Sequence, residues 1–379
     1  MQALIERARA RRRHIVSLIA ELVACESPSD DARAIKRFTE LVEAKVGQLA
    51  RCRLFPGGSF GPHLRCEFLL PGRKDDGRLL LLGHSDTVWP VGTLSRMPFR
   101  EHNGRLWGPG VLDMKAGIAL AIEAVALLRE LDRPVRRRLV LLLNSDEEIG
   151  SPSSRALIER EARTSAAVLV LEPGTGLEGK LKTARKGVGV YTLRVRGRAA
   201  HAGVDFTAGA NAALELARQI QRVARFTRLS RGVTVSPNVI RAGERSNVIP
   251  EEASAEIDVR VPRLTDAEEL DAKLRALHPR DERCRIEVEG GLNRPPMERS
   301  AGGVKLFRLA RELGRQIGLE LKESASGGGS DGNFTAALGV PTLDGLGAVG
   351  EGAHAPQESV LVDRLPERAA LLAGLITAI

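Results

Sequence analysis

Aromatic residues are scarce in this chain of 379 residues. They make up 3% of it, with one tyrosine and two tryptophans. Proteins that bind single-stranded nucleic acid stack the bases on aromatic side chains, so this composition argues against such a surface. The formal net charge of +9 does not reverse that conclusion, because the basic residues are spread along the chain and no groove-reading motif accompanies them. We therefore expect no nucleic-acid partner.

The chain also lacks paired cysteine motifs and long apolar runs. Its four cysteines have no C-x-x-C spacing, and a chain of this length needs no disulfide staples, so we expect free, buried thiols. No apolar run approaches the ~20 residues of a membrane span. The first apolar stretch is interrupted by Glu21. Because Ile15, Leu18 and Leu22 fall on one helical face, we predict a core helix there, not a secretory signal. These features predict a cytoplasmic protein with no membrane partner.

The length suggests two domains, and the order of elements predicts how they are divided. The first part alternates short apolar runs with helical patterns, which is typical of βαβ units with a largely parallel sheet. Between 187 and 297 the pattern becomes strand, helix, strand, strand, helix, strand, the order of a ferredoxin-like unit. The α/β pattern then returns. We predict a discontinuous α/β domain, 1–186 and 298–379, whose mixed, largely parallel sheet is flanked by helices, with an α+β domain, 187–297, inserted into it.

Polar residues follow three of the apolar runs in the α/β part. One run ends in His84 and Asp86, the next in Glu147 and Glu148, and the third in Glu172. The carboxyl ends of parallel strands meet at one edge of a sheet, so these side chains are expected to converge. Carboxylates crowded together repel unless a cation lies among them. Imidazole and carboxylate are ligands that suit zinc and similar metals, so the sequence favours a metal site at this edge.

Each candidate ligand taken alone has a structural explanation. Asp113 precedes a helical pattern and could be its N-cap. Glu147 and Glu148 could be a solvated pair in a loop, and His354 could be a structural histidine. The residues by themselves leave these alternatives open.

Several segments resemble the signature segments of the M20 metallopeptidases. The segments are Gly83-His84-Ser85-Asp86-Thr87-Val88, Gly108-Pro109-Gly110-Val111-Leu112-Asp113-Met114-Lys115, Asp146-Glu147-Glu148-Ile149-Gly150-Ser151 and, near the end of the chain, His354. Within that family, Thr87-Val88-Trp89-Pro90-Val91-Gly92-Thr93 and Pro98-Phe99 are most similar to glutamate carboxypeptidases. The resemblance covers nearly the whole chain, in order. It implies a zinc-exopeptidase-like catalytic domain and an inserted lid and dimerisation domain.

The resemblance also implies a set of residues that would bind two Zn²⁺ ions in each subunit. These ligands would be His84, Asp113 and Glu172 for one ion, and Asp113, Glu148 and His354 for the other. Asp113 would therefore bridge the two ions, and Mn²⁺ or Co²⁺ would suit the same ligands. Glu147 would be the general base, and Asp86 would orient His84.

The inserted domain would contribute substrate contacts. By resemblance, His201 would stabilise the oxyanion, although an alanine precedes it where serine is more usual. Asn247 and Arg260 would hold the carboxylate of the substrate, since the planar guanidinium of arginine can bind a carboxylate with two hydrogen bonds. Without the resemblance, Arg260 would be read as an exposed charge on a strand. Arg294 and Gly328 are further candidates for substrate contacts.

The activity that the resemblance implies is hydrolysis of an amide bond in a small peptide or N-acyl amino acid. The released C-terminal amino acid is expected to be glutamate, and the enzyme is expected to be a homodimer joined through the lid domain. One alternative is a deacylase acting on an N-acyl amino acid such as acetylornithine or succinyl-diaminopimelate. A second is a non-catalytic binding protein, against which the retention of Glu147 together with five ligands argues.

Overall fold

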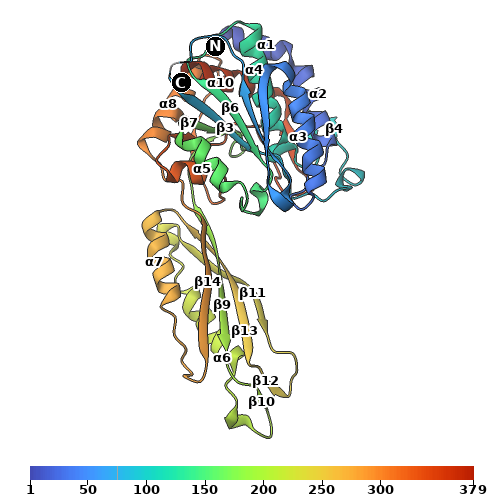
Figure 1. The fold of residues 1–379 in the computed structure, drawn as a ribbon. Coiled ribbons are helices and arrows are strands. Elements are labelled where there is room, and N and C mark those ends of the chain that lie inside the picture. Colours follow the sequence, from blue (N-terminus) through green and yellow to red (C-terminus); the bar gives the residue numbers. More distant parts are fainter. Residues whose placement is uncertain (75) are drawn as a thin grey trace. The chain divides into compact units, whose positions relative to one another are not determined.

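The computed structural model describes residues 1–74 and 76–379, which form two compact units (Figure 1). The first unit contains Met1–Ala184, Arg299–Ser326 and Ser330–Ile379. The second contains Arg185–Glu298 and the short segment Gly327–Gly329. The second unit is therefore an insertion into the first.

A six-stranded sheet forms the centre of the first unit. In spatial order its strands are β1 (Ala50–Phe55), β2 (His63–Phe68), β6 (Arg138–Asn144), β3 (Arg78–His84), β7 (Ser165–Val170) and β16 (Thr342–Leu343). The pairs β6–β3, β3–β7 and β7–β16 are parallel, and β1–β2 and β2–β6 are antiparallel. The sheet is thus mixed and largely parallel, as the sequence predicted.

Helices cover both faces of this sheet, because its central strands are apolar on both sides. Leu79 and Leu81 of β3 belong to one hydrophobic core, and Leu80 and Leu82 belong to the core on the opposite face. The helices of this unit are α1 (Gln2–Ala10), α2 (Arg12–Ala24), α3 (Ala32–Val46), α4 (Ala116–Glu130), α5 (Arg155–Arg163), α8 (Ala301–Arg315), α9 (Gly332–Ala337) and α10 (Leu365–Ala378). Residues of α1, α2, α3, α4, α8 and α10 line the first core, and residues of α5 and α9 line the second.

The most apolar helices of the first unit lie in its interior. Almost every residue of α4 and α10 is buried, and the two helices pack against each other. The apolar face predicted around Ile15, Leu18 and Leu22 is the buried face of α2. None of the helices within the described residues is long and apolar enough to cross a membrane.

Two smaller sheets complete the first unit. One has the order β17 (Gly350–Glu351), β18 (Ser359–Leu361), β5 (Arg105–Trp107) and β4 (Arg100–His102). The other pairs β15 (Glu323–Ser326) with β8 (Leu181–Arg185). The first of these sheets brings the segment around His354 next to the segment that leads to Asp113.

The second unit is a four-stranded antiparallel sheet with two helices. Its elements in chain order are β9 (Gly187–Arg196), β10 (Ala200–His201), α6 (Ala212–Ala224), β11 (Thr234–Ala242), β12 (Val248–Ile249), β13 (Glu252–Val261), α7 (Leu264–Arg275) and β14 (Arg285–Arg294). The sheet order β11-β13-β9-β14 is that of a ferredoxin-like unit, which agrees with the predicted order of elements. The short antiparallel pair β10–β12 was not predicted.

Candidate metal centre

Five of the predicted residues form two adjacent groups that can each hold a cation. His84, Asp113 and Glu172 make up one group, and Asp113, Glu148 and His354 make up the other. Within each group the candidate ligand atoms lie within 4.8 Å of one another. The His84 Nε2 atom is 3.2 Å from Asp113 Oδ1, and the His354 Nε2 atom is 3.3 Å from Asp113 Oδ2. Asp113 therefore turns one carboxylate oxygen toward each group.

The strand ends explain three of these positions. His84 is the last residue of β3, and Glu172 follows β7 by two residues. Glu148 lies in the short helical turn Glu147–Ile149 after β6. Since β6, β3 and β7 are parallel neighbours, their carboxyl ends lie side by side and bring these residues together, as expected for an open α/β sheet.

Asp113 and His354 come from irregular backbone. Asp113 lies in the turn Val111–Lys115 and has non-helical φ and ψ angles. Helix α4 begins at Ala116 with Lys115 as N-cap, and within the described residues that end has no side-chain capping bond. The alternative that Asp113 is an N-cap is therefore not observed. His354 has a φ of 62°, a left-handed conformation that is uncommon for residues other than glycine and that is found at functional sites.

Positive charge is favoured between these carboxylates. Burial opposes protonation of His84, yet its contacts with Asp113, Asp86 and Glu172 raise its pKa well above the usual value. Hydrogen bonds that the ring donates to the carboxylates of Asp113 and Glu148 raise the pKa of His354 to about 10. Burial raises the pKa of Glu148. A site of this kind stabilises a cation at the position where the rings and carboxylates meet.

The donor atoms also fit a divalent metal ion. The Oε1 atom of Glu148 is buried and has no hydrogen-bond partner among the described residues, although a buried carboxylate oxygen normally has one. The other Glu148 oxygen lies 3.2 Å from His354 Nε2. An unpaired buried acceptor beside imidazoles and carboxylates is suited to Zn²⁺ or a similar ion, which bonds to these donor types.

Asp86 contacts both His84 at the end of β3 and the backbone of Glu147, the predicted general base. Its Oδ1 accepts the N–H of Glu147 at 3.2 Å, and its Oδ2 accepts the N–H of Glu148 at 3.1 Å and the hydroxyl of Ser29 at 2.7 Å. The His84 Nδ1 atom lies 2.9 Å from the backbone carbonyl of Asp86 and 3.5 Å from its carboxylate. The carboxylate of Asp86 therefore fixes the backbone of 147–148, and its carbonyl contributes the short contact to His84.

Glu358 was not among the site residues predicted from the sequence, although it supports the turn that contains Asp113. Its side chain is fully buried, and its Oε1 accepts the N–H groups of Leu112 at 2.8 Å and Asp113 at 3.1 Å. Its Oε2 accepts the N–H of Gly110 at 2.9 Å and the indole N–H of Trp89 at 2.8 Å. Four N–H donors thus converge on one carboxylate four residues after His354. The sequence gives no signal for this role, because the donors are mostly backbone groups.

Two glycines allow close packing around the carbonyl of Leu171, the residue before Glu172. A Cβ atom on Gly117 of α4 would lie 2.3 Å from that oxygen, and one on Gly347 would lie 2.1 Å from it. Both distances are far below van der Waals contact. Larger residues at these positions would therefore displace the segment that carries Glu172.

The second unit contains the other predicted site residues, and His201 has a defined hydrogen-bonding state there. Its Nδ1 atom accepts the N–H groups of Gly203 and Val204, both at 3.1 Å. In a neutral imidazole the proton must then be on Nε2, which is left as a donor. His201 is exposed in β10, which pairs with β12, and the N–H of Ala202 donates to the carbonyl of Asn247 at 2.9 Å. His201 and Asn247 are therefore held on neighbouring segments.

Arg260, Arg294 and Gly328 occupy different surroundings within the second unit. The guanidinium of Arg260 makes two hydrogen bonds to Asp258, at 2.9 and 2.8 Å, so a substrate carboxylate would have to compete with this partner. Arg294 is 5% exposed, and a Cβ atom on Gly329 would lie 2.8 Å from its Cδ. The carbonyl of Gly328 accepts a hydrogen bond from Arg185 at 3.2 Å. The roles of these three residues toward a substrate remain predictions.

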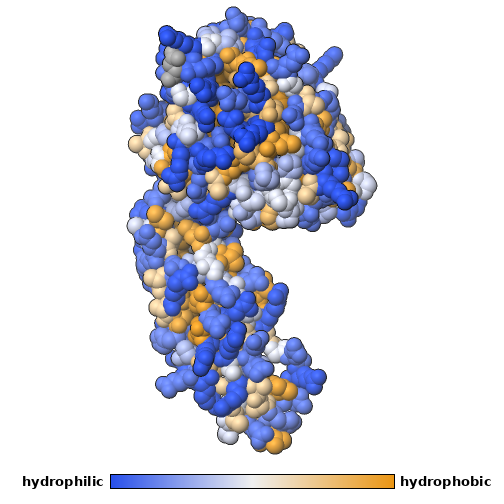
Figure 2. All heavy atoms as spheres, in the orientation of Figure 1, coloured by the Kyte–Doolittle hydropathy of each residue, from blue (hydrophilic) through white to orange (hydrophobic). Residues whose placement is uncertain are grey.

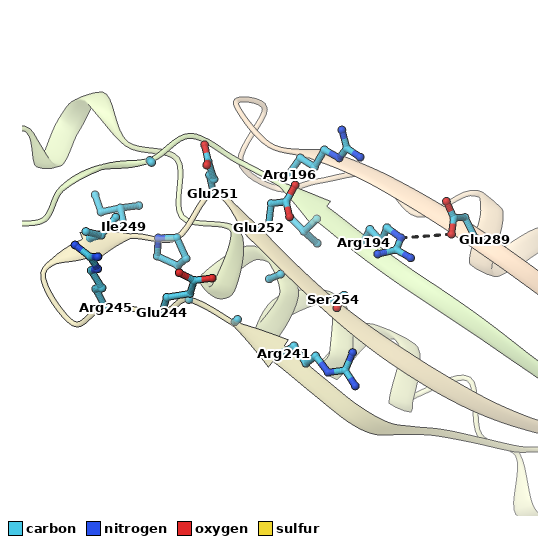
Figure 3. Close-up of a pocket in the computed structure, with 17 residues that line it drawn as sticks. Arg194, Arg196, Arg241, Glu244, Arg245, Ile249, Glu251, Glu252, Ser254 and Glu289 are labelled. Atoms are coloured by element: carbon cyan, nitrogen blue, oxygen red, sulfur yellow. Dashed lines mark hydrogen bonds and ion pairs between the residues drawn. The ribbon is translucent and has the colours of Figure 1, made fainter.

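A cavity of about 820 Å³ also lies in the second unit (Figure 3). Its charged lining residues come from the strands β9, β11, β13 and β14 and from the loops on either side of β12. They are Arg194, Arg196, Arg241, Arg245, Glu244, Glu251, Glu252 and Glu289. Four arginines are thus matched by four glutamates, and Arg194 is 3.4 Å from Glu289. This cavity has no excess positive charge to select an acidic ligand.

Known proteins resemble this chain in sequence and in structure. The family described as "Peptidase family M20/M25/M40" matches residues 80–378. The chain is 30% identical over 376 residues to carboxypeptidase G2 of Pseudomonas sp. (strain RS-16), covering 96% of this chain and 88% of the relative. It is 28% identical over 362 residues to succinyl-diaminopimelate desuccinylase of Thioalkalivibrio sulfidiphilus, covering 88% and 93% of the two chains.

Solved structures show the same fold. Aminopeptidase PepT from Bacillus cereus superposes with a TM-score of 0.81 at 24% identity, covering 97% of this chain and 98% of that one. The YXEP protein of Bacillus subtilis, described as a dinuclear metal binding peptidase from the M20 family, superposes with a TM-score of 0.69 at 15% identity, covering 98% of each chain. With a family match over most of its length and a relative at 30% identity, the chain belongs to peptidase family M20/M25/M40.

Proposed function

We propose that this protein is a dinuclear metal-dependent carboxypeptidase that releases a C-terminal amino acid, glutamate, from a small peptide or N-acyl amino acid. The observation that carries the proposal is the pair of ligand groups that share Asp113. A single ion would need only one such group. Two groups with a common carboxylate are the arrangement expected for two neighbouring ions.

The proposed cofactor is two Zn²⁺ ions in each subunit, with Mn²⁺ or Co²⁺ as ions that suit the same donors. His84, Asp113 and Glu172 would hold one ion, and Asp113, Glu148 and His354 the other. When bound, such a pair supplies Lewis acidity at the scissile carbonyl and lowers the pKa of water. All five residues offer oxygen or imidazole nitrogen, so the site does not depend on the cysteines.

Glu147 is the proposed general base. It is next to Glu148, and its backbone N–H is fixed by Asp86 at 3.2 Å, which limits the positions its side chain can reach. A carboxylate held there can accept the proton of the attacking water and return it to the leaving amine. The side chain is half-buried, which leaves it accessible to water while its backbone is fixed.

The second unit is proposed to bind the substrate. The Nε2 proton of His201 is available to donate a hydrogen bond to the oxyanion, because Nδ1 already accepts two backbone N–H groups. Arg260 is proposed to exchange its contact with Asp258 for the substrate carboxylate, with Asn247 as a second contact. The domain division proposed from the sequence, 1–186 with 298–379 and 187–297 as lid, assigns the chemistry to one domain and the recognition to the other.

Dimerisation through the lid domain is also proposed. Strand β11 is at an edge of the four-stranded sheet, so its backbone groups are open to pairing with another strand. Val239 and Ile240 of this strand are 39% and 55% exposed. Figure 2 shows hydrophobic patches among the hydrophilic residues of the face that it displays. An edge strand with exposed β-branched residues suits a strand of a second copy.

Deacylation of an N-acyl amino acid is the second candidate function. It is favoured by the 28% identity to a succinyl-diaminopimelate desuccinylase over most of both chains. The five candidate ligands and Glu147 would serve either reaction, since both reactions break an amide bond. The two candidates differ in the side chain and acyl group of the substrate, since both substrate classes have a carboxylate that Arg260 and Asn247 would bind.

Metal removal combined with a substrate panel tests the proposal. The enzyme would be stripped with a chelator, reloaded with Zn²⁺, Mn²⁺ or Co²⁺, and assayed on N-acyl-glutamates, dipeptides with C-terminal glutamate, and N-acetyl or N-succinyl diamino acids. We expect hydrolysis that is lost on chelation, restored by metal, and fastest with a C-terminal glutamate. Preference for substrates with a free basic amine would favour the deacylase, and chelator-insensitive or absent hydrolysis would refute both.

A further inference from the structure

Two of the four cysteines face each other across neighbouring strands of the central sheet. Strands β1 and β2 are antiparallel, and Cys52 lies directly opposite Cys66 in their register. Their Sγ atoms are 2.7 Å apart. Cys25 is the C-cap residue that follows helix α2, and Cys284 belongs to the second unit. With so few cysteines in 379 residues, a directly opposed pair is a specific feature of this sheet.

The backbone hydrogen bonds between β1 and β2 place the two cysteines in a geometry that suits a disulfide. The N–H of Leu69 donates to the carbonyl of Leu49 at 2.7 Å, so these two residues are a hydrogen-bonded pair in the same register. Hydrogen-bonded and non-hydrogen-bonded pairs alternate in an antiparallel ladder. Three positions further on, Cys52 and Cys66 are therefore a non-hydrogen-bonded pair. The Cα atoms of such pairs are about 4.5 Å apart, which lies at the short end of the range for disulfides, roughly 4.4 to 6.8 Å.

The two thiols differ in their access to solvent. Cys66 is fully buried in the main core, whereas Cys52 is half-buried on β1, the strand at the edge of the sheet. The hydrogen bond from Cys66 lowers the pKa of Cys52, and the same contact together with burial raises the pKa of Cys66. Cys52 is thus the thiol that a reagent in solution meets first, and it is the one that ionises more readily.

We infer that Cys52 and Cys66 are a modification site at which a low-molecular-weight disulfide, of the oxidised glutathione class, converts the two thiols into a cross-strand disulfide. The Cys52 thiolate attacks one sulfur of the small disulfide, forms a mixed disulfide and releases one small thiol. The Cys66 sulfur then loses its proton and attacks Cys52 Sγ, which releases the second small thiol. Two protein thiols are oxidised and one small disulfide is reduced to two thiols, so atoms and electrons balance.

The disulfide would link the edge strand β1 covalently to β2. β1 pairs with β2 alone in that sheet, and the two cysteines are 14 positions apart. Closing a loop of this length restricts the unfolded chain, and for a unit of this size the expected rise in Tm is on the order of 5 °C.

Thiol counting on the full-length protein tests the inference without any variant. The reduced, desalted protein would be incubated with oxidised glutathione, denatured, alkylated and weighed by mass spectrometry. We expect four alkylated thiols before oxidation and two afterwards, with peptide mapping showing Cys52 linked to Cys66. Retention of all four thiols, a stable glutathione adduct on Cys52, or a bond between other cysteines would each overturn the inference.

Serine variants provide the matched controls. Cys25→Ser and Cys284→Ser should each still lose two thiols on oxidation, whereas Cys66→Ser should lose one thiol and carry glutathione on Cys52. The rise in Tm should appear in the wild-type protein and in Cys284→Ser, and it should be absent from Cys66→Ser. An equal rise in Cys66→Ser would assign it to another site and contradict the proposed bond.

Discussion

Replacement of Glu358 by glutamine tests whether the turn that contains Asp113 is positioned by a carboxylate. Glutamine has nearly the same shape but has one acceptor oxygen in place of two. In the wild-type protein each oxygen of Glu358 accepts two N–H groups. After the change, one pair of donors would face an NH₂ group, which cannot accept a hydrogen bond.

The size of the effect follows from these contacts. A hydrogen bond to a charged group contributes about 1.5–3 kcal/mol to the free energy of unfolding. Because two of the four bonds would be lost, the free energy of unfolding would fall by at most ~3–6 kcal/mol. Relaxation of the turn would bring the loss toward the lower end of this range, about 3 kcal/mol. Asp113 lies in the turn that loses support, and loss of contacts that orient a metal ligand typically lowers metal affinity by about 10–100-fold. We expect Glu358→Gln to show both effects.

Glu215→Gln is the matched control for this variant. Glu215 is also a fully buried carboxylate, and it accepts the backbone N–H groups of Arg280 and Asp281 as well as a hydrogen bond from Gln219, all within the second unit. It should lose comparable stability and keep metal affinity. Urea unfolding would give the stabilities, and competition with a coloured chelator would give the affinities. Wild-type metal affinity in Glu358→Gln, or an equal loss of affinity in Glu215→Gln, would refute the positioning role.

Three further predictions follow from the site and its surroundings. Glu147→Gln should keep both metal ions by elemental analysis and lose kcat by about 10²–10⁴-fold, because the proton acceptor is gone; near-normal turnover would contradict its role as base. His201→Ala should lower kcat by about 10²–10³-fold with an unchanged Tm, since the side chain is exposed, and an effect on KM alone would point to substrate binding. Burial lowers the pKa of His63, so folding favours its neutral form. The stability that the neutral ring contributes is present above the pKa of the unfolded chain, about 6.5, and is lost as the pH falls. Urea unfolding from pH 8 to pH 5 should show that loss in the wild-type protein and a flatter profile in His63→Gln, and identical profiles would exclude His63 as the cause.

The strand-end residues of the candidate site could be predicted from the sequence. His84, Glu148 and Glu172 follow apolar runs, and parallel pairing of those runs brings their ends together. Asp113 and His354 could not be placed in this way, because a turn and a loop with a left-handed residue position them. Resemblance to a family was needed to add them, since no periodicity describes irregular backbone.

Other contacts depend on pairings that a sequence pattern does not encode. Glu358 meets Asp113 across 245 positions, through backbone N–H groups that every residue except proline has. The partner of Arg260 is Asp258, which is two residues away on the same face of its strand, and this pair was not expected. Cys52 and Cys66 meet because of one particular register, and a shift by one residue would turn one of them to the opposite face.

Anomalous X-ray diffraction from crystals of the zinc-loaded enzyme, measured on both sides of the zinc absorption edge, tests the central claim most directly. We expect two zinc peaks in each chain, one between His84, Asp113 and Glu172 and one between Asp113, Glu148 and His354. Zinc bound at other residues, or an enzyme that hydrolyses its substrate with neither position occupied, would contradict the account.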